Sequence, residues 1–171
     1  VGCPLATPSG KIELFSETIA SFSYDDCPGH PTWMEPVEWL GCAEPGQVHL
    51  ISNQPRNKLH SQLDHGAISR SDRPKGAEQV TLNPRDAEER GFMDGQILRL
   101  HNVRGGCLAE LRVDERIRPG VAQIATGAWL ELKGDTCQQG NPNTLTRDQG
   151  TSRLAQGPVA HSCLIWLERW H

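Results

Sequence analysis

The sequence predicts a mainly β fold with short helices, a barrel or sandwich of short strands behind an irregular N-terminal lead-in. From Gln47 onward, short apolar runs alternate with turn signals, which is typical of such folds. The 171 residues include 17 glycines and 12 prolines, which indicates many turns and short elements. Leu, Ile, Val and Phe make up about 21% of the chain, just above the roughly 20% below which chains stop folding. The length predicts one domain, or one domain with an appendage.

Six short strands are expected after the lead-in. In the clearest of them, Cys107, Ala109 and Leu111 share one face, whereas Glu110 and Arg112 lie on the other. The expected strands cover residues 48–52, 80–82, 97–102, 107–113, 121–125 and 162–168.

One helix has clear start and stop signals. Asn83 is a good N-cap, Pro84 takes the first helical position and Asp86 falls in the first turn. Gly91 ends the helix as a C-cap glycine. Farther on, residues 103–106 (Val-Arg-Gly-Gly) predict a hairpin turn whose two glycines supply positive φ angles.

The lead-in covers residues 1–46, and the barrel is expected over residues 47–171. Proline fixes φ and removes a backbone donor, so the proline-rich stretch 27–45 cannot be regular. Because Trp33 and Trp39 make this stretch too aromatic for a free linker, we expect it to pack on a neighbouring domain.

The start of the lead-in has mixed periodicity. Ile12 and Leu14 alternate like a short strand, whereas residues 17–22 fit one or two helical turns. The chain begins Val1-Gly2-Cys3 rather than with Met, and we therefore expect it to be part of a longer protein.

Composition excludes several classes of protein. No apolar run is long enough for a transmembrane helix, and the first residues of the given sequence do not have the pattern of a signal peptide. The net charge of −4 has no basic block behind it, which argues against a nucleic-acid surface. The six cysteines lie 15 to 65 residues apart without a C-x-x-C pair, which disfavours a zinc ribbon or redox dithiol. We expect free thiols, while their even number leaves disulfides open.

A donor-rich loop follows the first expected strand. Residues 52–62 contain Lys58 and His60 as charge or donor groups for a phosphate-bearing heterocycle, and Asn53, Gln54 and Gln62 as amides for its ring edges. Loops at the ends of strands commonly bind ligands. On this chemistry alone, an exposed polar loop is the simpler interpretation.

Two further regions are candidates. Residues 140–146 and 150–157 combine Gly and Asn with Ser and Thr, and the simpler interpretation is an Asn-Pro turn and a surface loop. His161 stands before an apolar strand, where a structural histidine is the commoner case. Cys27-x-x-His30 is at most half of a metal site. We find no nucleophile elbow, Walker motif or dinucleotide fingerprint.

Motifs along the whole chain resemble the dimethyl sulfoxide reductase family of bacterial molybdopterin oxidoreductases, most closely its biotin sulfoxide reductase and trimethylamine N-oxide reductase branch. Each motif is weak alone, but their order and spacing make the resemblance strong. The segments that carry it are 7–14, 29–36, 59–62, 83–95, 140–146 and 150–157.

The resemblance implies a six-stranded double-psi β-barrel, the C-terminal domain that caps the cofactor in that family. The implied cofactor is a bis(molybdopterin guanine dinucleotide) molybdenum centre, which in the family removes an oxygen atom from an S-oxide or N-oxide. The implied partners are the upstream domains of the same chain and this small-molecule substrate. We expect the isolated domain to have no turnover and to lack the cofactor.

Cofactor-binding positions are carried over residue by residue. Lys58 falls where the family commonly has Arg, and Lys keeps the charge but lacks the planar fork of a bidentate contact. No catalytic residue or metal ligand is implied, because the molybdenum-ligating side chain lies upstream in the family. The implied cofactor-binding residues are Ser52, Asn53, Gln54, Pro55, Lys58, His60, Ser61, Gln62, Asn143, Ala160 and His161.

Alternatives from other classes stay open at this point. The chain would also fit a stand-alone β-barrel that binds a partner protein or a nucleotide without catalysis, or a remnant that stores or delivers the cofactor. The thiols and the biotin-sulfoxide-like character favour the cytoplasm over the periplasm.

Overall fold

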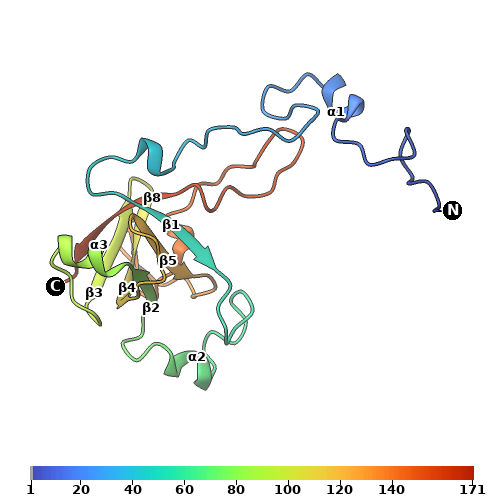
Figure 1. Cartoon of the computed structure of the whole chain (residues 1–171). Coiled ribbons are helices and arrows are strands. Elements are labelled where there is room, and N and C mark those ends of the chain that lie inside the picture. Colours follow the sequence, from blue (N-terminus) through green and yellow to red (C-terminus); the bar gives the residue numbers. More distant parts are fainter. Residues whose placement is uncertain (1) are drawn as a thin grey trace. The chain divides into compact units, whose positions relative to one another are not determined.

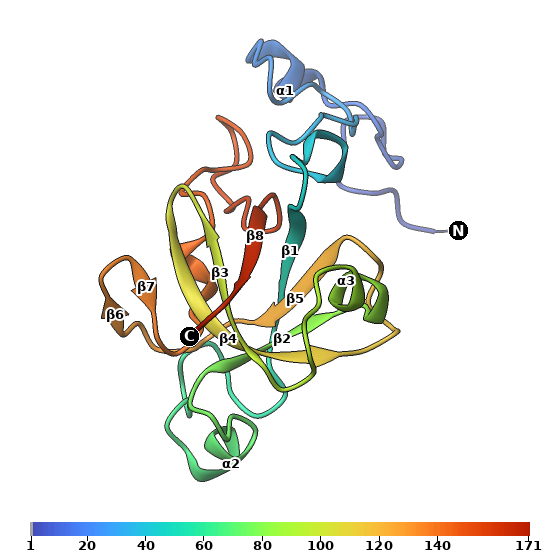
Figure 2. The ribbon, with the colours of Figure 1, turned by 90° about the vertical axis from the view of Figure 1, so that its left-hand side faces the viewer.

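The structure, a computed structural model, describes residues 2–171 and contains a closed six-stranded β-barrel. The barrel strands follow one another in the order β2-β5-β1-β8-β3-β4, and a β2–β4 pairing closes the ring (Figures 1 and 2). The predicted mainly β fold and its six strands are therefore confirmed; the double-psi connectivity stays a prediction. The strands are β1 (Val48–Asn53), β2 (Glu78–Leu82), β3 (Ile97–Asn102), β4 (Gly105–Val113), β5 (Val121–Ala125) and β8 (Leu164–Arg169).

Parallel and antiparallel pairs are mixed in the barrel. β1 runs parallel to β5, from His49 opposite Val121 to Asn53 opposite Ala125, and β2 runs parallel to β4. The other barrel neighbours are antiparallel. Because β1 and β5 are parallel neighbours, the loops that follow them leave the barrel at the same end.

Alternating apolar residues fill the barrel. In β4, Cys107, Ala109 and Leu111 are buried, while Glu110 is half-buried and Arg112 exposed, as the alternation predicts. One cluster of buried side chains unites all six barrel strands with Ala87 of α3 (Pro84–Glu89). The barrel thus has a single core.

The signals that predict α3 are all observed. The Asn83 side chain accepts a hydrogen bond from the Arg85 amide at 2.9 Å, Pro84 takes the first position and Asp86 lies in the first turn. Gly91 follows the helix in the left-handed region with φ +65°. Local capping chemistry explains both ends of this helix.

The predicted hairpin between β3 and β4 forms with a different turn. Asn102 pairs with Gly105, so the turn residues are Val103 and Arg104, and both glycines belong to β4. A Cβ atom on Gly105 would lie 3.1 Å from the Thr144 carbonyl oxygen and 3.2 Å from that of Asp135. Close approach of the backbone, rather than turn geometry, explains a glycine here.

Several short elements have no clear sequence signal. The α2 helix is about one turn long, and its N-cap residue, Gly66, has no side chain that could cap it. Strands β6 and β7 have two residues each, and β7 pairs with β4 far away in the sequence. These elements are α2 (Ala67–Ser71), β6 (Leu132–Lys133), β7 (Thr136–Cys137) and the 3-10 helices η1 (Leu40–Cys42) and η2 (Pro142–Thr144).

The chain divides into two compact units. One contains the chain up to Pro36 together with residues 149–158, and the other contains residues 37–148 and 159–171, including the whole barrel. The predicted packing of residues 1–46 on a neighbouring domain stays a prediction.

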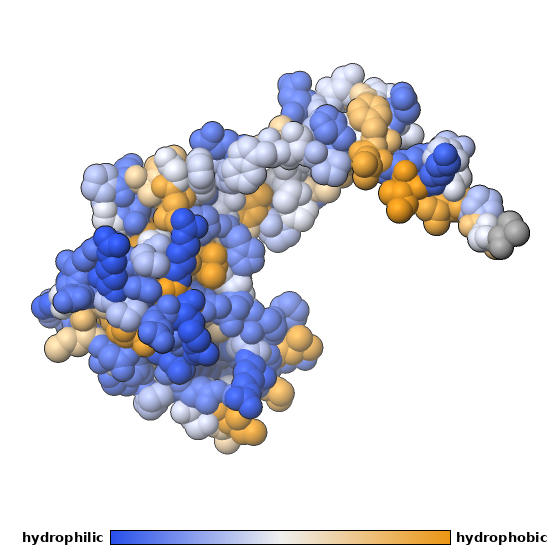
Figure 3. Space-filling view, in the orientation of Figure 1, coloured by the Kyte–Doolittle hydropathy of each residue, from blue (hydrophilic) through white to orange (hydrophobic). Residues whose placement is uncertain are grey.

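The first unit contains the helix α1 (Glu17–Ser21), within the stretch where one or two helical turns were expected. The alternative of a short strand at Ile12 and Leu14 is wrong, because among residues 2–36 the structure has no strand and both side chains are about four-fifths exposed. Figure 3 shows hydrophobic side chains on the surface of this N-terminal segment. Within the unit, Asp26 accepts from the Arg153 amide at 3.0 Å.

Candidate functional site

A cavity of about 690 Å³ lies at the end of the barrel where β1 and β5 finish. Seven of the eleven residues that the resemblance implies line it, although they come from three distant parts of the sequence. Those seven are Ser52, Gln54, His60, Ser61, Asn143, Ala160 and His161.

Two loops, residues 54–63 after β1 and residues 126–130 after β5, form facing walls of the cavity. The Thr126 amide donates to the Asn53 carbonyl oxygen at 2.9 Å, which continues the parallel pairing beyond the strands. The Trp129 indole Nε1 donates to the Ser61 carbonyl oxygen at 2.9 Å. The two walls are therefore held to each other by hydrogen bonds as well as by the strands below them.

Gly127 allows the closest approach of these walls. Its φ is +93°, and a Cβ atom placed there would lie 1.7 Å from the His60 carbonyl oxygen. No side chain fits at this separation, so a glycine is required. The backbone of His60 itself is left-handed, with φ +48°, which is unfavourable for a residue with a side chain.

The third wall comes from the segments before β8 and around η2. The His161 ring accepts from the Ser52 amide at 3.4 Å, and the His161 carbonyl oxygen lies 2.5 Å from His49 Nε2. The Asn141 side chain accepts from the Asn143 amide at 2.9 Å and so caps η2. This cap is a use of Asn expected from the sequence, and it engages the backbone amide of Asn143 rather than its side chain.

Four polar side chains at the cavity have no hydrogen bond to the rest of the chain. Within residues 2–171, this holds for the side chains of Ser52, His60, Ser61 and Asn143, all of which are exposed or half-buried. Their donors and acceptors are available to a ligand. Convergence of such groups with an aromatic side chain, here Trp129, is what small-molecule sites typically show.

The cavity lining combines polar side chains with apolar ones. Among the lining residues that the structure describes, none is Asp, Glu, Lys or Arg. Trp129 is half exposed and offers a flat apolar surface. The site therefore suits a ligand with amide-like edges and an aromatic face, bound by hydrogen bonds and stacking.

Four of the implied residues do not line the cavity. Asn53 and Pro55 line a different pocket. Gln62 is exposed, and its backbone amide donates to the Leu59 carbonyl oxygen. Lys58 is buried, and its Nζ atom lies 2.7 Å from Asp64 and 2.6 Å from Glu78.

The candidate regions 140–146 and 150–157 lie in different compact units of the structure. Asn143 reaches the cavity, whereas residues 150–157 belong to the other compact unit. There they form a loop in which the Thr151 amide donates to the Gly157 carbonyl oxygen and Gly150 bridges to Pro158.

Sequence reasoning missed the wall formed by residues 126–130. Asn141, which also lines the cavity, belongs to the candidate region 140–146 but not to the residues implied by the resemblance. The available signal was that residues 126–130 directly follow an expected strand, like the loop after β1. Parallel pairing of β1 with β5 brings the two loops together, and this pairing is not visible in the sequence pattern.

The cysteines are free thiols, and three of them, Cys107, Cys137 and Cys163, are buried. Burial raises the pKa of Cys163 to about 11 despite nearby Arg104, and burial together with Cys137 also raises the pKa of Cys107. Protonated, buried thiols are poor nucleophiles and poor metal ligands.

Neither a metal cluster nor a membrane-spanning helix is found in the described chain. Over residues 2–171, no three His, Cys, Asp or Glu side chains are grouped so that they could hold a metal ion. Over the same residues, no helix has the length and apolar character needed to cross a bilayer.

Comparison with known proteins identifies a family. The sequence model of the family described as "Molydopterin dinucleotide binding domain" matches residues 48–164, which include the barrel up to the start of β8 and every residue of the cavity lining.

Longer proteins match nearly the whole chain. A biotin sulfoxide reductase of Cereibacter sphaeroides is 48% identical over 168 residues, which are 96% of this chain and 22% of that protein. Trimethylamine-N-oxide reductase 1 of Escherichia coli (strain K12) is 44% identical over 178 residues, 98% of this chain and 21% of that protein. The chain thus spans about a fifth of the length of these relatives.

A solved structure has the same fold. Acetylene hydratase from Pelobacter acetylenicus matches with a TM-score of 0.78 over 99% of this chain and 25% of that one. At 21% sequence identity, this likeness concerns the fold.

Proposed function

The chain belongs to the family of molybdopterin dinucleotide binding domains, and on this premise we propose that it is the cofactor-capping C-terminal domain of a molybdenum oxidoreductase that reduces S-oxides or N-oxides. The single observation that carries the proposal is the cavity at the end of β1 and β5, where polar side chains without partners in the chain converge. The names and lengths of the relatives support a larger enzyme around this domain.

The cavity lining fits the pterin part of such a cofactor. A pterin is a flat heterocycle whose edges carry amide, amine and ring-nitrogen groups. Ser52, His60, Ser61 and Asn143 offer complementary donors and acceptors, and Trp129 offers an aromatic face. These residues would hold the cofactor, while the family's metal-ligating side chain is expected upstream.

The finer identity of the cofactor is part of the proposal. We propose the bis(molybdopterin guanine dinucleotide) form in the full-length enzyme and no retained cofactor in the 171-residue chain alone. When bound, the molybdenum centre supplies the two-electron chemistry of oxygen-atom transfer. The residues of this chain orient the pterin and exclude water from one side of it.

The experiment that tests the proposal replaces cavity side chains in the full-length enzyme that contains this segment. His60→Ala and Asn143→Ala remove lining groups, and His101→Ala removes a half-buried histidine of β3 that does not line the cavity. We expect pterin and molybdenum content and sulfoxide or N-oxide reduction to fall in the first two variants only. Unchanged metal content and unchanged rate in both would refute the assigned role.

We also propose that the full-length enzyme resides in the cytoplasm rather than the periplasm. The free thiols support this location, because scattered unpaired cysteines are commoner in reducing compartments. Fractionation of cells that make the native protein tests it, and recovery in the periplasmic fraction would contradict it.

A further inference from the structure

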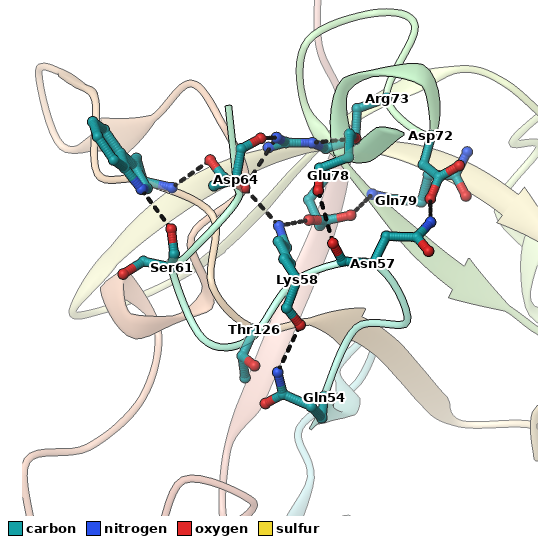
Figure 4. A network of polar contacts seen from close by, with 12 residues as sticks. Gln54, Asn57, Lys58, Ser61, Asp64, Asp72, Arg73, Glu78, Gln79 and Thr126 are labelled. Carbon is teal, nitrogen blue, oxygen red and sulfur yellow. Dashed lines mark hydrogen bonds and ion pairs between the residues drawn. The ribbon is translucent and has the colours of Figure 1, made fainter. Parts of the chain in front are cut away.

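A cluster of four charged side chains is buried beside the cavity loop. Lys58 Nζ lies 2.7 Å from Asp64 Oδ1 and 2.6 Å from Glu78 Oε2, and Arg73 Nη2 lies 2.9 Å from Asp64 Oδ1 (Figure 4). All four side chains are at least nine-tenths buried. We call Lys58, Asp64, Arg73 and Glu78 the buried ion cluster.

The buried ion cluster is electrically balanced, with two cations and two anions. Burial by itself raises the pKa of Asp64, but the hydrogen bond and charge of Lys58, with the charge of Arg73, outweigh this effect and lower it. Asp64 is therefore ionised at neutral pH. Such a cluster is unfavourable to leave incomplete, because removal of one member leaves a buried charge without its partner.

Lys58 and Asp64 stand at the two ends of segment 58–64, which contributes His60 and Ser61 to the cavity. Between them, His60 has φ +48° and Leu63 has φ +65°, so two residues with side chains adopt the left-handed conformation. Strained backbone of this kind persists only where the surroundings hold it. The ion pair between the ends of the segment is such a constraint, since it closes the loop that presents His60 and Ser61 to the cavity.

The same cluster reaches the facing wall. The second carboxylate oxygen of Asp64 accepts from the Trp129 amide at 3.3 Å, and the Trp129 side chain bonds to the Ser61 carbonyl oxygen. On the near side, the Gln54 side chain donates to the Lys58 carbonyl oxygen at 3.0 Å. Both walls of the cavity are thus connected to one buried group of charges (Figure 4).

We propose that the buried ion cluster positions the cavity walls for the ligand, and that Lys58 acts through Asp64 as a positioning residue rather than as a contact to the cofactor. This inference rests on the proposed function of the cavity. It assigns to the cluster a role in cofactor retention that is separable from its contribution to overall stability.

The test uses the full-length holoenzyme and follows the release of pterin by its fluorescence, at a fixed temperature below the melting temperature of every variant. Lys58→Met removes the charge, and Lys58→Arg keeps it. Asp86→Asn is the matched control, because Asp86 is a buried carboxylate that bonds to Gly120 and Arg90 at the start of β5, away from the cavity.

We expect Lys58→Met to release pterin about tenfold faster, by analogy with the roughly 10- to 100-fold loss of affinity or activity when the partners that orient metal ligands are removed. Lys58→Arg restores slow release, and Asp86→Asn lowers the melting temperature without faster release. Equal release from Lys58→Met and wild-type protein would overturn the inference, as would equal acceleration in Asp86→Asn at the same loss of melting temperature.

A second variant covers the case in which Lys58→Met does not fold. Lys58→Met/Glu78→Gln removes one cation and one anion and leaves the Asp64–Arg73 pair intact, so no charge is left unbalanced. Faster release is expected here too, and release at the wild-type rate would overturn the inference.

A lining variant separates failure of this inference from failure of the proposed function. His161→Ala removes a cavity residue outside the buried ion cluster. If His161→Ala accelerates release and neither Lys58→Met nor Lys58→Met/Glu78→Gln does, only the positioning role is wrong. If all three variants release pterin at the wild-type rate, the cavity is not the cofactor site.

Discussion

The two ends of the β1–β5 pair are built differently. At the start of β5, Asp86 of α3 accepts from the Gly120 amide at 2.7 Å and the Asn83 side chain donates to the Ile117 carbonyl oxygen at 2.7 Å. At the finish of the same strands, Ser52, His60, Ser61 and Asn143 have no side-chain hydrogen bond within residues 2–171.

The backbone follows the same division. After α3 the left-handed backbone position is taken by a glycine, Gly91. At the cavity the left-handed position is taken by His60, which has a side chain. Local backbone strain reduces stability and persists mainly at functional sites. The unpaired polar side chains at this end are accessible to solvent and to a ligand. The comparison teaches that one end of the barrel is built for stability and the other for binding. The following changes test it, from the largest expected effect to the smallest.

Gly127→Ala should have the largest effect. Its Cβ would lie 1.7 Å from the His60 carbonyl oxygen, so the two cavity walls must separate, and we expect a loss of about 4 kcal/mol or more in the free energy of unfolding. Denaturant unfolding of the 171-residue chain measures this. The control is Gly134→Ala, since Gly134 also has a positive φ but open space around it, and about 1 kcal/mol is expected there. Equal losses would show that the contact is unimportant.

Asp86→Asn should destabilise the opposite end by about 1–3 kcal/mol, because the amide cannot accept from both Gly120 and Arg90 as the carboxylate does. The cavity is left intact, so the pterin content of the full-length enzyme should not change. Thermal unfolding and pterin analysis of the same preparation measure the two effects. If Asp86→Asn lost pterin in proportion to its loss of stability, the two ends of the barrel would not have separate roles.

The pH dependence of stability should depend on Asp64. Its pKa is lower in the folded chain than in the unfolded chain, so its ionised form stabilises the fold fully above about pH 4. This contribution is lost as the pH falls through the folded-state pKa. Denaturant unfolding between pH 7 and pH 3 should therefore show wild type and Asp64→Asn converging as the pH falls. Parallel curves would contradict the assigned ionisation.

His60→Gly should have the smallest effect on stability and the opposite sign. Glycine adopts φ +48° without the unfavourable contact of a Cβ, so the free energy of unfolding should stay the same or rise by up to about 1 kcal/mol. The lining side chain is lost, so pterin retention in the full-length enzyme should fall. A clear loss of stability would mean that the His60 side chain supports the fold rather than the ligand.

Local patterns gave good predictions where the signal is local. The alternation of Cys107, Ala109 and Leu111 identified the inward face of β4, and Asn83 with Gly91 located both ends of α3. Predictions failed where contacts between residues distant in the sequence determine the local structure. Ile12 and Leu14 have no partner strand among residues 2–36. Gly105 of β4 is explained by its approach to the carbonyl groups of Thr144 and Asp135 rather than by the turn.

For the candidate site, residue chemistry and family resemblance selected residues but could not say which way they face. Seven of the eleven implied residues line one cavity, yet Lys58, which the sequence places among exposed polar neighbours, is buried between Asp64 and Glu78. Glu78 lies 20 residues away, and no periodicity links it to Lys58.

By itself, the sequence determined the six barrel strands, the capped helix α3 and the polar loops, because hydrophobic alternation, capping groups and prolines act over a few residues. The tertiary structure alone decided that β1 and β5 lie parallel, that their loops enclose one cavity with His161, and that four charges meet beneath it. These features depend on closure of the barrel, which brings together residues more than 100 positions apart, such as Ser52 and His161.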